Sequence, residues 1–79
     1  MQEVVPGKRY RHFKGKEYKV LMIAYDCESS DDNLKKVVVY QAEYDDKKVW
    51  VRDYDSFASL VDKNKYPDIT QEYRFELID

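Results

Sequence analysis

The residues best suited to catalysis in this chain are its single histidine, His12, and its single cysteine, Cys27. A nucleophilic mechanism would need Cys27 or a serine that the imidazole of His12 activates. No serine lies in a motif such as G-x-S-x-G, which holds a nucleophile on a strained turn. Cys27 follows an apolar stretch, where a partly buried and inert thiol is typical. We therefore predict no catalytic residue.

Metal and cofactor sites are not predicted either. A structural zinc ion normally takes four ligands from cysteine and histidine, and the chain has one of each. The acidic residues within 26–32 lack the central glycine and the terminal glutamate of a calcium loop. With two glycines in the whole chain, no glycine-rich loop can surround a phosphate. We expect no bound metal ion and no cofactor.

A binding face is the stronger candidate, because aromatic and basic side chains alternate on neighbouring strands. Trp50 and Arg52 share one face of their strand, and an indole beside a guanidinium can stack on planar groups. If residues 45–48 connect a hairpin, tyrosines of the preceding strand lie beside them. The alternative is that this face is half of the core, with Arg52 extending to water. The predicted binding residues are Tyr10, His12, Tyr40, Tyr44, Trp50 and Arg52.

Length and composition predict one small domain over residues 1–79, with aromatic side chains supplying much of its apolar area. The formal net charge is −2, from 14 basic and 16 acidic residues, so no strong positive field attracts nucleic acid or an anionic membrane. The longest apolar run, residues 20–25, is too short to span a bilayer. The N-terminus lacks the apolar stretch of a signal peptide, and one cysteine suits a reducing compartment. We expect a cytoplasmic protein that makes no contact with a membrane.

Five strands must position these side chains. Alternating or β-branched stretches predict strands over residues 8–13, 17–26, 35–44, 49–53 and 71–79. Gly15 supplies the positive φ of the first hairpin turn, whereas residues 45–48 form the second turn without a glycine. In the second strand we expect Met22 on the same face as Val20, and Ile23 on the opposite face. In the third strand we expect Val39 to be buried.

The stretch after the fourth strand changes its period. Phe57, Leu60 and Val61 recur at helical spacing, which predicts one or two helical turns within residues 54–61. Five short strands with one such turn favour a mainly β fold, as a small antiparallel barrel or a strongly bent sheet.

Three motifs together resemble a small bacterial family of unknown function. They are G-x-Y-R-H-F-K-G-x-x-Y-x-V, with one additional residue after Gly7, then V-V-Y-x-x-x-Y and W-V-R-x-x-x-x-F. The motifs include Tyr18, Tyr44, Trp50 and Phe57, and the resemblance runs from about residue 7 to residue 78. It implies a compact five-stranded barrel like the Src-homology-3 fold, and it implies no particular activity.

Two binding functions are compatible with these observations. The first is a non-catalytic interaction module that recruits a protein or peptide through the aromatic and basic face. The alternative is a barrel that binds single-stranded nucleic acid, with bases stacked on tyrosines and Trp50, and with Lys14, Lys16 and Arg52 at phosphates. The acidic balance of the chain disfavours this alternative. A small enzyme that uses His12 as acid and base ranks third.

Overall fold

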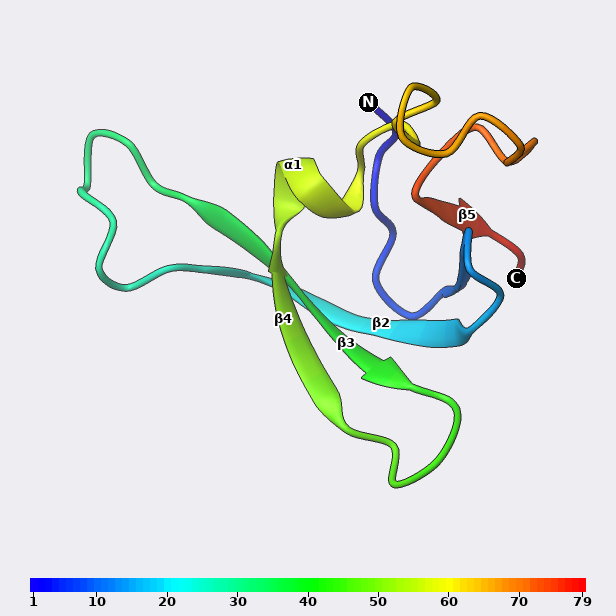
Figure 1. The fold of residues 1–79 in the computed structure, drawn as a ribbon. Helices are drawn as coiled ribbons and strands as arrows, with labels where there is room; N and C mark the ends of the chain where they lie inside the picture. The colour runs from blue at the N-terminus through cyan, green and yellow to red at the C-terminus, as the bar shows by residue number, and fades with distance from the viewer.

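The computed structural model describes residues 1–79, and its framework is one five-stranded antiparallel sheet (Figure 1). The sheet has the order β4-β3-β2-β1-β5, so β1 lies between β2 and β5. The mainly β fold, the five antiparallel strands and the short helix that we predicted are confirmed. The elements in chain order are β1 (Arg9–His12), β2 (Glu17–Tyr25), β3 (Lys36–Ala42), β4 (Val49–Asp53), α1 (Tyr54–Phe57) and β5 (Phe75–Leu77).

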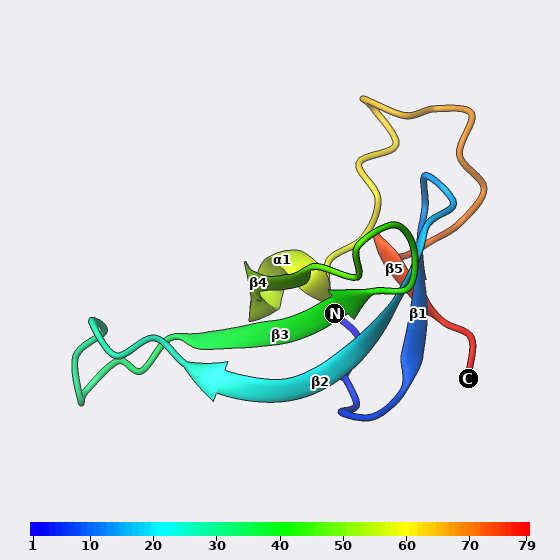
Figure 2. The same ribbon diagram turned by 90° about the horizontal axis from the view of Figure 1, so that it is seen from below.

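The sheet is strongly bent but open. Strands β4 and β5 form its two edges, and they do not pair with each other. Two views at right angles show β1 and β5 turned away from the β3–β4 hairpin (Figures 1 and 2). A single bridge between Leu60 and Tyr73 joins the segments that follow α1 and precede β5. A closed barrel is therefore not confirmed.

Both hairpin turns contain residues with positive φ, but the residue types differ between them. Gly15 takes φ 108° in the β1–β2 turn, as predicted, and its lack of a Cβ makes this conformation accessible. The β3–β4 turn has no glycine, and there Asp45 and Lys47 take φ values of 52° and 55°. Aspartate tolerates this region better than most residues, whereas lysine has no such advantage.

Strand β2 contains a β-bulge that corrects our prediction of its faces. Val20 pairs with Tyr40, but Met22 pairs with Val39 and Ile23 with Val38, so Leu21 is the extra residue. Because paired residues share a face, Ile23 lies on the same side as Val20, and Met22 points to solvent. The predicted assignment was wrong because a strict two-residue period cannot anticipate an inserted residue.

The core lies on one face of the bent sheet, beneath α1 and the N-terminal segment. Phe57 and Phe75 stack in parallel with ring centroids 3.9 Å apart, and Tyr10 meets Phe57 edge-on at 5.5 Å. Val38 is fully buried, whereas Val39 is only partly buried, because Val39 belongs to the opposite face of β3. Our prediction that Val39 is a core residue was therefore wrong by one position.

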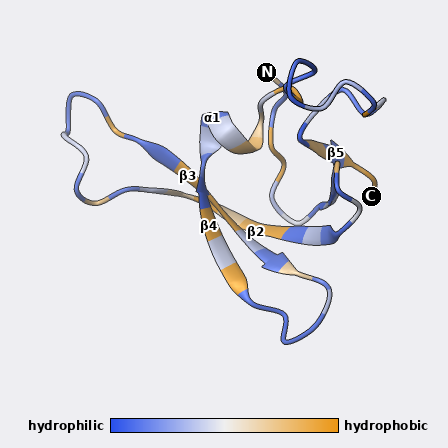
Figure 3. Ribbon diagram, in the orientation of Figure 1, coloured by the Kyte–Doolittle hydropathy of each residue, from blue (hydrophilic) through white to orange (hydrophobic).

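Polar loops surround this framework. Hydrophilic residues predominate in the β2–β3 loop and in the β3–β4 turn, while the apolar positions lie mainly on the strands (Figure 3). Helix α1 has four residues, and no helix is long and apolar enough to cross a membrane.

Candidate binding site: an aromatic pocket beside β4

A pocket of about 220 Å³ opens beside β4 and is lined almost entirely by aromatic side chains. Strand register explains the assembly, because Trp50 pairs with Tyr40 across β3 and β4, and Tyr18 of β2 follows next to them in the sheet. We call this site the aromatic pocket. Its lining residues are Tyr18, Tyr40, Tyr44, Trp50 and Arg52.

The tyrosines of the aromatic pocket hold one another in place. The hydroxyl oxygens of Tyr18 and Tyr44 lie 2.7 Å apart, within hydrogen-bond distance. The Tyr18 ring also meets Tyr40 and Tyr44 edge-on, with centroids 5.3 Å and 5.6 Å away. Burial, together with the hydrogen bond to Tyr44, raises the pKa of Tyr18. The Tyr18 hydroxyl therefore stays protonated well above neutral pH.

Arg52 contributes a half-buried positive charge to the pocket wall. Its Nε donates to the Tyr40 hydroxyl at 3.2 Å, and its Nη1 donates to the Ser56 hydroxyl at 3.3 Å. Its guanidinium carbon lies 5.4 Å from the centroid of the Phe75 ring. Two hydroxyls and a ring face thus orient Arg52, and no carboxylate neutralises it.

His12 packs against Phe75, outside the pocket lining, and its surroundings favour the neutral imidazole. Its ring meets Phe75 edge-on at 5.0 Å, and its Nδ1 accepts a hydrogen bond of 3.1 Å from the Lys14 backbone N–H. Burial, then the charges of Arg52, Arg74 and Lys14, lower the pKa of His12 to about 4. A neutral imidazole of such low basicity is a weak general base at neutral pH.

The structure separates the six predicted binding residues into two groups. Tyr40, Tyr44, Trp50 and Arg52 line the aromatic pocket together, whereas His12 lies outside its lining. Tyr10 is fully buried in the core, and its hydroxyl accepts the Val5 backbone N–H at 2.9 Å. A ligand on the surface cannot reach Tyr10, because this tyrosine lies under the N-terminal segment.

Sequence reasoning left Tyr18 out of the predicted site, and it named Lys16 only as a phosphate contact in the nucleic-acid alternative. Tyr18 lines the pocket, and the Nζ of Lys16 lies 4.5 Å from the centroid of the Tyr44 ring. Tyr18 pairs with Ala42, which places it diagonally between Tyr40 and Tyr44. The alternation of Tyr18 and Val20 was a visible signal, but the register of β2 against β3 was needed to use it.

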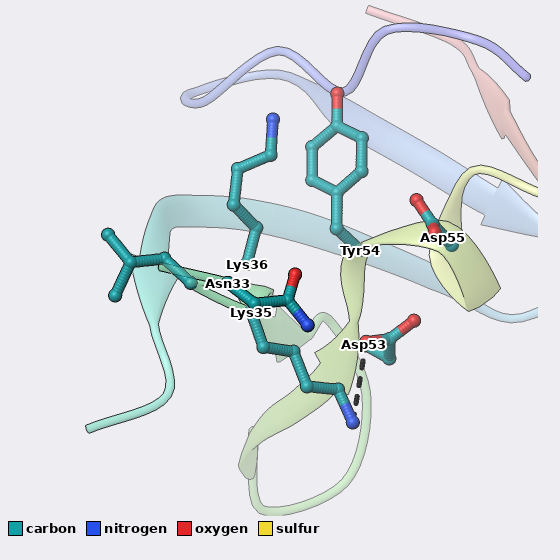
Figure 4. Close-up of a pocket in the computed structure, with 7 residues that line it drawn as sticks. Asn33, Lys35, Lys36, Asp53, Tyr54 and Asp55 are labelled. Atoms are coloured by element: carbon teal, nitrogen blue, oxygen red, sulfur yellow. Dashed lines mark ion pairs between the residues drawn. The ribbon is translucent and has the colours of Figure 1, made fainter. Parts of the chain in front are cut away.

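A second, larger pocket of about 410 Å³ lies where the β2–β3 loop meets the start of α1 (Figure 4). One ion pair lies within it. The Lys35 ammonium lies 3.7 Å from an Asp53 carboxylate oxygen, and the Nζ of Lys36 lies 4.3 Å from the centroid of the Tyr54 ring. Tyr54 is the single aromatic side chain of this lining, so the second pocket lacks the aromatic wall of the first. The lining residues are Asn33, Leu34, Lys35, Lys36, Asp53, Tyr54 and Asp55.

Comparison with known proteins gives a family. Neither the curated proteins nor the solved structures contain a match to this chain. A family model described as a protein of unknown function, DUF1653, matches residues 8–77. This range includes all five strands, α1 and the whole aromatic pocket. The predicted membership in a family of unknown function is confirmed: the chain belongs to the DUF1653 family.

Proposed function

We propose that this protein is a small non-catalytic interaction module that binds a partner protein or peptide through the aromatic pocket. The observation that carries this proposal is the gathering of four aromatic side chains and one unpaired arginine around a single opening. Trp50 remains 47% exposed at its rim. Tyrosine, tryptophan and arginine are the side chains that dominate binding energy at protein interfaces. The pocket volume is below the roughly 300–1,000 Å³ of sites for drug-sized ligands, so it suits one side chain of a partner.

The state of His12 supports a non-catalytic role. Its Nδ1 is already occupied by the Lys14 backbone N–H, and its pKa of about 4 makes it a poor proton acceptor at neutral pH. Its neighbours Arg52 and Arg74 are cations, which further disfavour a protonated imidazole. An enzyme that needs His12 to gain and lose a proton near neutral pH would require the opposite environment.

The proposal includes a fold type and a location. We place the chain, as one domain, among small Src-homology-3-like barrels that are open between β4 and β5. The pairing of β1 with both β2 and β5, and the short helix between β4 and β5, support this placement. Cys27 is exposed, so our expectation of a partly buried thiol was wrong. A cytoplasmic location is supported by this exposed free thiol, which a reducing compartment would preserve.

The test is selection from a random peptide library displayed on phage. The chain has one tryptophan, so the indole N–H of Trp50 gives a single NMR resonance inside the pocket. We expect selected peptides to shift this resonance and to lose binding to Trp50→Ala. Tyr25→Ala is the matched control, because Tyr25 is an exposed aromatic residue at the far end of β2.

The two variants separate the possible results. Loss of binding in Trp50→Ala, with binding retained in Tyr25→Ala and native circular dichroism in both, supports the pocket as the site. A library that yields no peptide with an effect on the Trp50 resonance would contradict the proposal. Equal loss of binding in both variants would show that the peptides do not bind specifically at the pocket.

The alternative function is binding of single-stranded nucleic acid. It is favoured by one observation: Arg52 and the exposed Trp50 line the same pocket, Lys16 lies over its Tyr44 ring, and neither cation forms an ion pair. Such binding would fall steeply with salt. Fluorescence titration of Trp50 with oligouridylate at low salt tests it, and an unchanged signal would exclude this function.

A further inference from the structure

Two cations at the aromatic pocket have no carboxylate partner: Arg52 in its wall and Lys16 over the Tyr44 ring. The structure contains six ion pairs, and none of them includes Lys16 or Arg52. Arg52 is held only by two hydroxyls and the Phe75 ring. Nε and one N–H of Nη1 are used in these hydrogen bonds, and the remaining N–H groups of Arg52 can still donate to a charged acceptor.

The same cations argue against a cationic ligand. Aromatic pockets commonly bind ammonium groups through their ring faces. Here Lys16 already lies over the Tyr44 ring, and Arg52 stands in the pocket wall. A second cation would be repelled, whereas a carboxylate could take both donors of the guanidinium fork. The pocket therefore favours an anionic side chain with apolar neighbours.

The edge of the sheet beside the pocket is free to receive an extended chain. Strand β4 pairs only with β3. On the face away from the pocket, Val49 and Val51 are 54% and 63% exposed, which is unusual for apolar residues of a strand. A segment that pairs with β4 would place alternate side chains beside Trp50 and Arg52 and the intervening ones beside the two valines.

The surroundings of β4 favour a peptide over a nucleic acid. The turn that precedes β4 is neutral, because Lys47 and Lys48 balance Asp45 and Asp46. Asp55, just after β4, is exposed and has no cationic partner. A phosphate backbone that runs along β4 would meet this negative charge, because every nucleotide adds an anion. A peptide with one acidic residue avoids the conflict.

We propose that β4 binds an extended peptide segment as a sixth strand, with an acidic side chain facing Arg52, an aromatic one beside Trp50 and apolar ones beside Val49 and Val51. This inference rests on the proposed function of the aromatic pocket. It adds the charge of the partner, its extended conformation and the edge on which it lies.

The test uses two matched peptides that differ by one charge. The probes are acetyl-Thr-Glu-Val-Tyr-Val-amide and the same peptide with glutamine in place of glutamate. In an antiparallel pairing with β4, the glutamate lies opposite Arg52 and the tyrosine opposite Trp50. The amide end removes the terminal carboxylate, so the side chain is the only anion. Fluorescence of Trp50 and the exchange protection of the β4 amides report binding.

We expect the glutamate peptide to bind about tenfold more tightly than the glutamine peptide, because the charged hydrogen bond is roughly twice as strong. In Arg52→Met the preference should disappear, while weak binding of both peptides remains. Arg9→Met is the matched control, since it removes an arginine outside the pocket, and the preference should persist there. Circular dichroism confirms that each variant is folded.

Several outcomes would overturn the inference, and they differ from failure of the proposed function. Equal affinity for the two peptides would contradict the preference for an acidic side chain, while the pocket would remain a binding site. Tighter binding of octauridylate than of either peptide would identify a nucleic acid as the partner. Protection of β4 amides that rises with protein concentration, without peptide, would identify a second copy of this chain. Failure of both peptides while library peptides still shift the Trp50 resonance would overturn only this inference.

Discussion

Two arginines of this protein lie in opposite electrostatic environments. Arg9, on the outer face of the sheet, is paired with three carboxylates: Glu43 at 2.6 Å, Glu17 at 2.8 Å and Asp79 at 3.4 Å. Those carboxylates raise the pKa of Arg9, with the Glu43 hydrogen bond as the largest cause. Arg52, on the inner face, is half buried and has no carboxylate at all.

This contrast is informative because the two arginines are both partly buried. Burial alone would favour a carboxylate beside each of them. The chain nevertheless places carboxylates around Arg9 and none beside Arg52. The acidic side chain of the proposed partner would supply the missing negative charge at Arg52.

The largest effect on stability is expected at Phe75, the core residue that contacts Arg52. Phe75 stacks on Phe57 and also lies under the guanidinium of Arg52. Phe75→Ala should lower the free energy of unfolding by about 3–5 kcal/mol, because it removes a buried ring and leaves a cavity. Urea unfolding followed by circular dichroism measures the loss. Leu77→Ala, on the same strand but half exposed, is the control, and an equally small effect of both changes would show that Phe75 is not central.

A smaller effect is expected from the neutral state of His12. Its pKa is about 4 in the folded protein and 6.5 as the ordinary value, so folding favours the unprotonated ring. This contribution is complete above pH 6.5 and is lost as the pH falls toward 4. Allowing for solvent screening of a partly exposed ring, about 1–2 kcal/mol should be lost.

His12→Asn isolates this contribution, because the amide oxygen can accept the Lys14 backbone N–H as Nδ1 does. The free energy of unfolding is measured for both proteins at neutral pH and near pH 4. The wild-type protein should lose more than the variant over this interval. Parallel pH profiles would show that the positive surroundings of His12 do not affect stability.

The smallest effect compares the two arginines directly. Arg52→Met should raise the pKa of His12 toward 6.5, because Arg52 is the strongest charge that lowers it. Arg9→Met should leave that pKa unchanged and lower stability slightly, by an amount that vanishes at high salt. Proton NMR of the single histidine measures both shifts. Equal shifts in the two variants would mean that the faces of the sheet are not electrostatically separate.

The strands of this fold were predictable because their signals are local. Alternation and β-branched residues identified all five strands, and Gly15 identified the first turn. The burial of Tyr10 was not predictable, because it depends on contacts across one face of the sheet. Phe57 of α1 meets its ring edge-on, and the N-terminal segment covers its hydroxyl.

In the candidate site, too, the residues joined by a short turn were predictable, and those joined over a long loop were not. Tyr40, Trp50 and Arg52 were predicted to lie together because the β3–β4 hairpin joins them over a short turn. Tyr18 was missed because its place depends on the register of β2 against β3, which a long loop separates. The second pocket, which includes Lys35 and Asp53, was not predicted, because it forms where the β2–β3 loop meets α1.

Because of its bulge, β2 contains one residue, Leu21, that pairs with no residue of β3. Loss of Leu21 would leave every other pairing with β3 unchanged, because Leu21 has no partner of its own. Loss of Ile23 would instead bring Met22 opposite Val38, into the space that a branched side chain now fills. A regular ladder would also twist less, which would change the angle at which β3 and β4 approach Phe75. The effect of a deletion in β2 therefore depends on its position. Loss of Leu21 would change the twist of the sheet, whereas loss of Ile23 would change the packing of the core.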